Sequence, residues 1–271
     1  MRMFARSLFF LVVLFVVYSL LSRPAYALSQ QAYQDYLYQF DQYRRTYSEF
    51  TTAKNEYLKF KSLTSQTTAL TNTTAMLSQR YQLLRAYLLL LGEKLNEDKG
   101  LPDDQKTVYR ALINTQIEAM NAGNLTISTV GSLDDAEAVS KNFEKQYPIL
   151  SAAFRQTIVG ITMGQLFSSA RQFDGVFDEI RGTVQRSRST FSPQKQATMD
   201  RWILQIANVR SLYQQKMDDI ATKNRTLNER TLDGMDDVFR TLKRDLGEAK
   251  KYMIDGTGYM EELIQTLTYQ Q

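Results

Sequence analysis

Residues 232–267 read LDGMDDVFRTLKRDLGEAKKYMIDGTGYMEELIQTL, and apolar or small side chains recur there at alternating spacings of three and four residues. This is the a/d pattern of a coiled-coil seam, and it predicts one long coiled-coil-like helix over residues 230–270. At about 1.5 Å per residue the helix is roughly 55 Å long, more than the width of a compact domain of this chain length. We therefore expect an elongated helical bundle. The seam residues are Leu232, Met235, Phe239, Leu242, Leu246, Ala249, Met253, Gly256, Met260, Leu263 and Leu267.

The rest of the chain also has the composition of α-helix. It is rich in Gln, Lys, Glu, Leu and Ala, the whole chain contains only four prolines, and no long run alternates as a strand would. These features predict the all-α class. We expect an N-terminal helical pair over residues 28–99 and a bundle over residues 100–271 that continues the same elongated domain. The sequence leaves open whether the two helices that meet near KSLTSQ (residues 61–66) form a hairpin or a single rod.

Several residues mark expected helix ends. Gly100 fits a left-handed C-cap before Pro102, and the next helix is expected from residue 104 to about residue 122. Ser132 is expected to start a further helix, which Pro148 either kinks or restarts. Ser192 followed by a proline has the order of an N-cap and a first helical position.

The N-terminus has the three-part pattern of a secretory signal. Arg2 and Arg6 precede an uncharged apolar run, and Ala25 and Ala27 supply the small side chains of a cleavage site. The apolar run is shorter than the roughly 20 residues that span a bilayer, which favours a cleaved signal peptide over residues 1–27. The alternative is an uncleaved anchor, the only membrane contact that we expect. Both interpretations predict an exported protein, either extracellular or in the periplasm or cell envelope.

Charge and composition exclude several classes of function. Without Arg2, Arg6 and Arg23 of the signal, 30 basic residues face 29 acidic ones, so the remaining chain carries a formal charge of +1. Nucleic-acid binding needs clustered surplus Lys and Arg, so we expect none. The chain contains no Cys and no His, which removes disulfides, the commonest metal ligands and the usual general base. We therefore expect no enzyme activity, no cofactor and no metal.

A second periodic pattern, made of aromatic residues, lies near the N-terminus. In YQDYLYQFDQYRRTYSEF, residues 33–50, rings recur at spacings of three and four. A stripe at helical spacing favours packing between helices, and the alternative is a row of exposed rings that stack on sugars or peptides. If the protein binds a partner or a second copy, the two seams are the surfaces expected to do so. The predicted interface residues are Tyr36, Tyr43, Tyr47, Phe239, Leu242, Leu246 and Met253, with Leu242 and Leu246 foremost.

Four glycines fall on one face of a predicted helix. Glycine destabilises a helix interior by up to about 1 kcal/mol relative to alanine, so such a face indicates close backbone approach. The first interpretation is a tight helix crossing. The second is a groove for an extended ligand, with Arg171 and Asp178 as polar contacts. The residues concerned are Gly160, Gly164, Arg171, Gly175, Asp178 and Gly182.

The N-terminal part of the chain resembles a group of bacterial proteins. The segment YRRTYSEFTTAKNEYLKFKSLTSQTTALTNTTAMLSQRYQLLRAYLLLLGEKL (residues 43–95), with the signal pattern before it, is similar to secreted helical proteins of candidate-phyla-radiation bacteria. The resemblance implies an exported bacterial protein and carries no activity or catalytic residue.

These features together predict an exported, non-enzymatic helical scaffold. It would associate with itself or contact a partner protein or another component of the cell envelope. The alternative is an extracytoplasmic ligand-binding or sensor-like bundle with its site on the glycine face.

Overall fold

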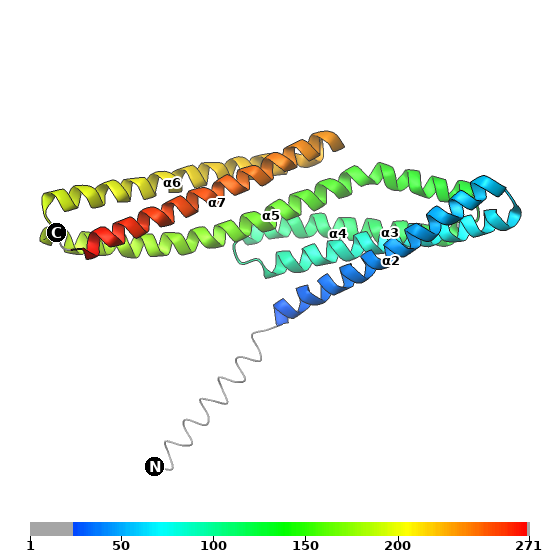
Figure 1. The fold of residues 1–271 in the computed structure, drawn as a ribbon, viewed down its shortest axis with the longest axis horizontal. Coiled ribbons are helices and arrows are strands. Elements are labelled where there is room, and N and C mark those ends of the chain that lie inside the picture. The colour runs from blue at the N-terminus through cyan, green and yellow to red at the C-terminus, as the bar shows by residue number, and fades with distance from the viewer. Residues whose placement is uncertain (1–23, 270–271) are drawn as a thin grey trace, which may run out of the picture. The chain divides into compact units, whose positions relative to one another are not determined.

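The computed structural model describes residues 24–269, and this part of the chain is built from α-helices without a strand (Figure 1). The prediction of an all-α helical bundle with long helices is therefore confirmed. Most of the predicted signal lies at residues 1–23, outside the described residues. No helix within residues 24–269 has the length and apolar character needed to cross a membrane. The elements are α2 (Pro24–Phe60), α3 (Leu63–Glu97), α4 (Asp103–Thr126), α5 (Leu133–Ser187), α6 (Pro193–Arg225) and α7 (Leu232–Thr268), with single 3-10 turns η1 (Ile127–Thr129), η2 (Arg188–Thr190) and η3 (Leu227–Glu229).

The chain divides into two compact units. Unit 1 contains the residues up to Glu97 together with Ile113–Phe143, and unit 2 contains Asp98–Leu112 together with the residues from Glu144 onward. Of the three boundaries between the units, one directly follows the last residue of α3, and the other two fall inside helices, one in α4 and one in α5. Each unit is therefore built from segments that are distant in sequence.

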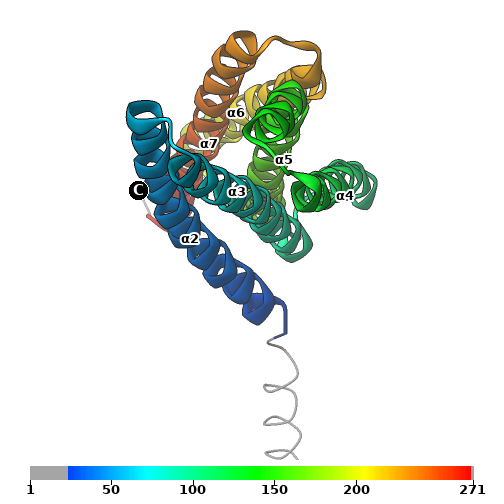
Figure 2. The same ribbon diagram turned by 90° about the vertical axis from the view of Figure 1, so that its right-hand side faces the viewer.

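In unit 1, α2 and α3 form a hairpin and lie side by side (Figure 2). Lys61 ends α2 in the left-handed region, with φ 48°, and its N–H donates to Tyr57 O at 2.9 Å. Ser62 and Ser65 then cap α3 reciprocally: the Ser65 N–H donates to Ser62 Oγ at 3.2 Å, and the Ser62 N–H donates to Ser65 Oγ at 3.1 Å. Because these contacts stop one helix and start the next, the described chain has a hairpin here and not a single rod.

The last part of α4 packs in the core of unit 1, and α4 is longer than expected. The ring of Tyr81, which is buried, packs edge-on against Phe143 with centroids 5.6 Å apart. A Cβ at Gly123 of α4 would overlap that Tyr81 ring, so only glycine allows the ring and the helix to lie this close. The helix continues through Gly123 to Thr126, whereas the sequence predicted an end near residue 122.

In unit 2, the long helices enclose one apolar core. On α6, buried residues recur every seven positions at Met199, Ile206, Tyr213 and Ile220. The α7 seam faces the same cluster, so the predicted coiled-coil pattern packs against helices of its own chain. At Gly256 a Cβ would lie 2.8 Å from the Phe173 ring, which explains the glycine in the seam as a place of close approach to α5.

The predicted helix ends are mostly confirmed. Ser192 is the N-cap of α6, where the Lys195 N–H donates to Ser192 Oγ at 3.3 Å. Ser132 accepts from the Asp135 N–H at the start of α5, and Pro148 lies inside that continuous helix, so it does not start a new one. The prediction for Gly100 is wrong, because no glycine among the described residues has a positive φ. Gly100 is instead required for close packing, as shown below.

Candidate functional site

The predicted glycine face separates into two parts. Gly160 and Gly164 are sites of close approach: a Cβ at Gly160 would lie 2.5 Å from the Tyr109 ring, and one at Gly164 would overlap the Asp98 carboxylate. Gly175 and Gly182 face open space or the end of an arginine side chain. The first two glycines therefore serve packing between α5 and the segment that begins α4, which agrees with the tight-crossing interpretation.

The Asp98 carboxylate fixes the loop that packs against Gly164 of α5. Its Oδ1 accepts hydrogen bonds from the N–H groups of Gly100, at 2.9 Å, and Leu101, at 2.7 Å. This turn places Gly100 against the backbone oxygen of Gly164, where no side chain would fit. The loop thus contacts α5 through the backbone. Other residues of the chain occupy the space beside Gly160 and Gly164.

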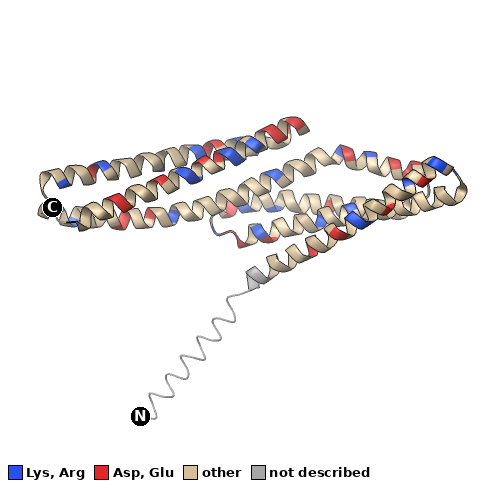
Figure 3. Cartoon of the chain, in the orientation of Figure 1, with Lys and Arg blue, Asp and Glu red and all other residues tan. Residues whose placement is uncertain are grey.

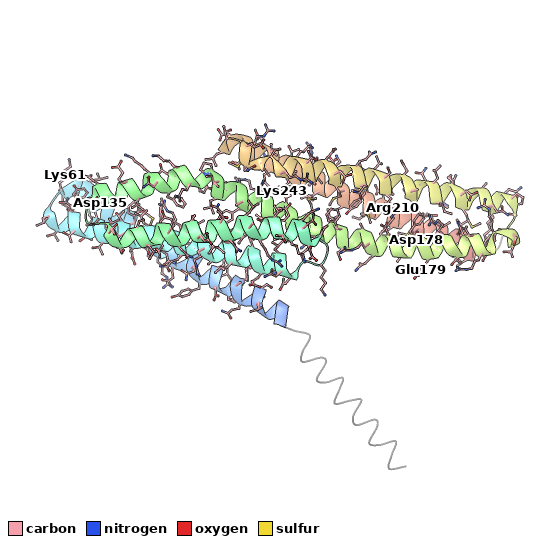
Figure 4. The ribbon with its side chains drawn as sticks, turned by 180° about the vertical axis from the view of Figure 1, so that it is seen from behind. Lys61, Asp135, Asp178, Glu179, Arg210 and Lys243 are labelled. Carbon is pink, nitrogen blue, oxygen red and sulfur yellow. The ribbon has the colours of Figure 1, made fainter. Side chains whose placement is uncertain are left out.

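The two polar residues expected to contact a ligand have separate partners. Arg171 donates through Nη2 to the carbonyl oxygen of Lys99. Asp178 lies on the exposed side of α5 beside Glu179 (Figure 4) and forms an ion pair with Arg181 at 3.2 Å. The glycine face at residues 160–182 therefore does not form one continuous ligand groove. Arg171 lines a different pocket, which is described below.

The predicted partner contacts on α7 require correction. Leu242, Leu246 and Met253 are 0%, 6% and 9% exposed, and they belong to the core of unit 2. Phe239 is partly buried against the same cluster, and Lys243 Nζ lies 5.3 Å from its ring. These residues are not available to another protein while unit 2 is folded, because helices of the same chain already satisfy the seam.

The aromatic pattern on α2 separates into two stripes. Tyr36, Tyr43 and Phe50 form the inner stripe, which faces α3 and the core of unit 1. The Tyr36 ring lies 5.3 Å from that of Tyr87, and Tyr43 and Phe50 pack against the cluster around Leu77. The interpretation as a packing seam is thus right for this half of the pattern.

The outer stripe consists of Tyr33, Leu37, Phe40 and Tyr47. Their exposed fractions are 43%, 36%, 39% and 51%. Each aromatic residue of the outer stripe lies three residues before one of the inner stripe. Tyr47 and Phe50 are such a pair, and their ring centroids are 6.0 Å apart. Sequence spacing alone could not separate the stripes, since rings three and four residues apart all fall within one broad face of a helix.

The hydroxyls of Tyr43 on α2 and Tyr87 on α3 are uncharged. Burial raises the pKa of Tyr43, although the charge of Arg80 opposes the shift. Burial and the neighbouring Tyr36 raise the pKa of Tyr87. These hydroxyls therefore remain protonated at neutral pH. Lys and Arg are interspersed with Asp and Glu along the helices of each unit (Figure 3).

Within residues 24–269, no three His, Cys, Asp or Glu side chains are grouped so that they could hold a metal ion.

Comparison of the chain with protein-family models, with curated proteins and with solved structures gave no match.

Proposed function

We propose that this chain is an exported, non-enzymatic helical protein that associates with a second copy of itself through the outer stripe of α2. The observation that carries the proposal is the exposure of three aromatic rings and a leucine on a helix whose other aromatic stripe is already packed. Export is supported by the signal pattern at residues 1–27, and the cell envelope is the proposed location.

The outer stripe has the chemistry of a protein–protein contact. Tyrosine and phenylalanine are enriched at the centres of interfaces because their rings bury a large area at a small entropic cost. Contiguous exposed apolar patches are uncommon on monomeric proteins and mark interaction sites. Because the inner stripe fixes the orientation of α2, the outer rings are also held in place before any partner arrives.

The spacing of the rings favours a second copy as the occupant. Tyr33 and Tyr47 lie seven residues before and seven residues after Phe40, so the stripe has the same order of rings in both chain directions. A two-fold axis near Phe40 would bring the two Phe40 rings together and place each Tyr33 near Tyr47 of the second copy. Such a contact is self-complementary, as the isologous interface of a two-fold dimer must be. The formal charge of +1 for residues 28–271 adds little repulsion between copies.

The non-enzymatic part of the proposal rests on composition. A chain without histidine and cysteine lacks the side chains that most often act as general base, nucleophile or zinc ligand.

The test is the molar mass of residues 28–271, measured by light scattering after size exclusion over a range of concentrations. We expect a dimer for the unchanged chain and a monomer for the double variant Phe40→Glu, Tyr47→Glu, because buried carboxylates would oppose the contact. Circular dichroism of the double variant should be unchanged, since both side chains are exposed in the single chain.

A matched control is Leu204→Glu on α6, which changes a side chain that is 69% exposed in unit 2. This variant should remain a dimer. A monomeric unchanged chain at every concentration, or a double variant that still dimerises, would show that the outer stripe is not the contact.

A further inference from the structure

Unit 2 contains a pocket that the proposed self-association does not use. Its volume is about 630 Å³, and it lies among the loop before α4, α5 and α6. Phe167 of α5 and Met253 of α7 contribute apolar walls, and Gly100 of the loop lines it as well. This volume is within the range of roughly 300–1,000 Å³ that is usual for small-molecule sites.

One wall carries a buried hydroxyl without a hydrogen-bond partner. Tyr213 of α6 is 3% exposed, and its hydroxyl meets no acceptor or donor among the described residues. Burial, with a smaller effect from the Asp174 carboxylate, raises the pKa of Tyr213 well above its usual value, so the hydroxyl keeps its proton. The hydroxyl oxygen is also closed to solvent, so Tyr213 contributes to the pocket wall through the rest of its side chain and not through a hydrogen bond to a ligand.

The polar side of the pocket has one positive charge in excess. Arg210 and Asp174 form a bidentate pair, with Nε–Oδ1 and Nη2–Oδ2 distances of 2.7 Å each. Arg171, the third charged residue of the wall, donates to the Lys99 carbonyl and meets no carboxylate in the described chain. Since a guanidinium group has five N–H donors, most of those of Arg171 remain available to a ligand.

We infer that this pocket binds a small amphiphile that carries one carboxylate on an apolar body. Arg171 would bind the carboxylate, and Phe167 with Met253 would cover the apolar body. One uncompensated guanidinium matches one negative charge, whereas a phosphate dianion would leave a charge unpaired. The planar guanidinium also suits the planar carboxylate.

The probe is decanoate, titrated by calorimetry into residues 28–271 below its micelle concentration. Decanol and decyltrimethylammonium test the head group, because they keep the alkyl chain but carry no charge or a positive one. We expect saturable binding of decanoate and at least about tenfold weaker binding of the two other probes. Bound decanoate should also raise the thermal midpoint of unit 2, followed by the fluorescence of Trp202, the single tryptophan of the chain.

Two variants test the wall of the pocket. Arg171→Met should weaken decanoate binding by about tenfold, which is the effect expected for a charge-assisted pair. Tyr213→Phe should leave decanoate binding unchanged and keep or raise the midpoint of the empty protein, because the hydroxyl has no partner to lose and is closed to the pocket.

The matched control is Arg181→Met, which removes a guanidinium from the same helix that pairs with Asp178 outside this pocket. It should leave decanoate binding unchanged. The inference is overturned if decanoate does not bind, if decanol binds equally well, or if Arg171→Met and Arg181→Met bind decanoate with the same affinity. None of these outcomes depends on the oligomeric state, so failure here and failure of the proposed self-association can be told apart.

Discussion

Gly100 packs directly on the backbone of Gly164, so closely that a Cβ at position 100 would overlap the carbonyl oxygen of residue 164. The contact joins a loop to the middle of α5 within unit 2, and the Asp98 carboxylate fixes the loop by accepting two backbone N–H groups. A backbone oxygen in a helix cannot move aside without breaking its own hydrogen bond. Both glycines are therefore required by packing and not by a left-handed backbone conformation.

We predict that Gly100→Ala lowers the free energy of unfolding of unit 2 by about 1–3 kcal/mol, the usual cost of forcing an extra group into packed structure. Urea unfolding followed by Trp202 fluorescence measures this change, because Trp202 lies on α6 and packs against the unit 2 core. Stability equal to that of the unchanged chain would mean that the loop is not held against α5 as described.

Gly175→Ala is the matched control and should change stability in the opposite direction. Nothing lies within 4 Å of a Cβ at this position in α5. Alanine should therefore stabilise the helix by about 0.5–1 kcal/mol, since it restricts the unfolded chain without a clash. The same urea experiment reports the result, and destabilisation here would show that the open space around Gly175 is filled in solution.

The ion pair of Asp245 predicts a pH dependence of stability. Asp245 of α7 is 2% exposed, and Lys223 Nζ of α6 donates to it at 2.8 Å. Burial raises the pKa of this carboxyl, but the hydrogen bond and charge of Lys223, with the charge of Lys216 and a contact from Arg244, outweigh burial and bring the pKa below its usual value. A carboxyl with a depressed folded pKa contributes stability above its unfolded pKa and loses it as the pH falls through the folded value.

We therefore expect Asp245→Asn to destabilise unit 2 by about 1.5–3 kcal/mol at pH 7. The difference between the variant and the unchanged chain should shrink as the pH falls below about 4. Urea unfolding at a series of pH values measures this. Asp200→Asn removes an exposed partner of Arg188 and should have little effect at any pH. A difference for Asp245→Asn that stays constant from neutral to acidic pH would contradict the ion-pair account.

Periodicity predicted the helices, and it also predicted which face of α7 is buried. Leu242 and Leu263 are both fully buried, as a strict a/d seam requires. Periodicity could not say whether the covering helices belong to the same chain, because an a/d seam has the same pattern within a chain and between chains. For this reason the sequence predicts a partner contact at Leu242 and Leu246, whereas the structure buries both in the core of unit 2.

The contacts of the glycines and the residues of the pocket could not be predicted from the sequence, for a different reason. Gly160, Gly164, Gly175 and Gly182 share a helix face, yet only the first two are sites of close approach, because the segment that begins α4 reaches only that part of α5. The pocket joins Arg171 to Tyr213 and Gly100, which are separated by 42 and 71 positions in the chain. The local sequence does not predict that these residues lie together, because only tertiary packing brings them into one pocket.

Leu242→Asp tests the internal seam of α7 directly. A carboxylate would replace a fully buried leucine in the core of unit 2, and the expected loss of stability is on the order of 3–5 kcal/mol. Ile254→Asp changes a residue of the same helix that is 59% exposed, so it should alter stability by no more than about 0.5 kcal/mol. Trp202 fluorescence and circular dichroism report unfolding, and light scattering reports mass. If Leu242→Asp kept its native stability and only dissociated an oligomer, the seam would lie between chains, and the assignment of α7 to the core of its own chain would be wrong.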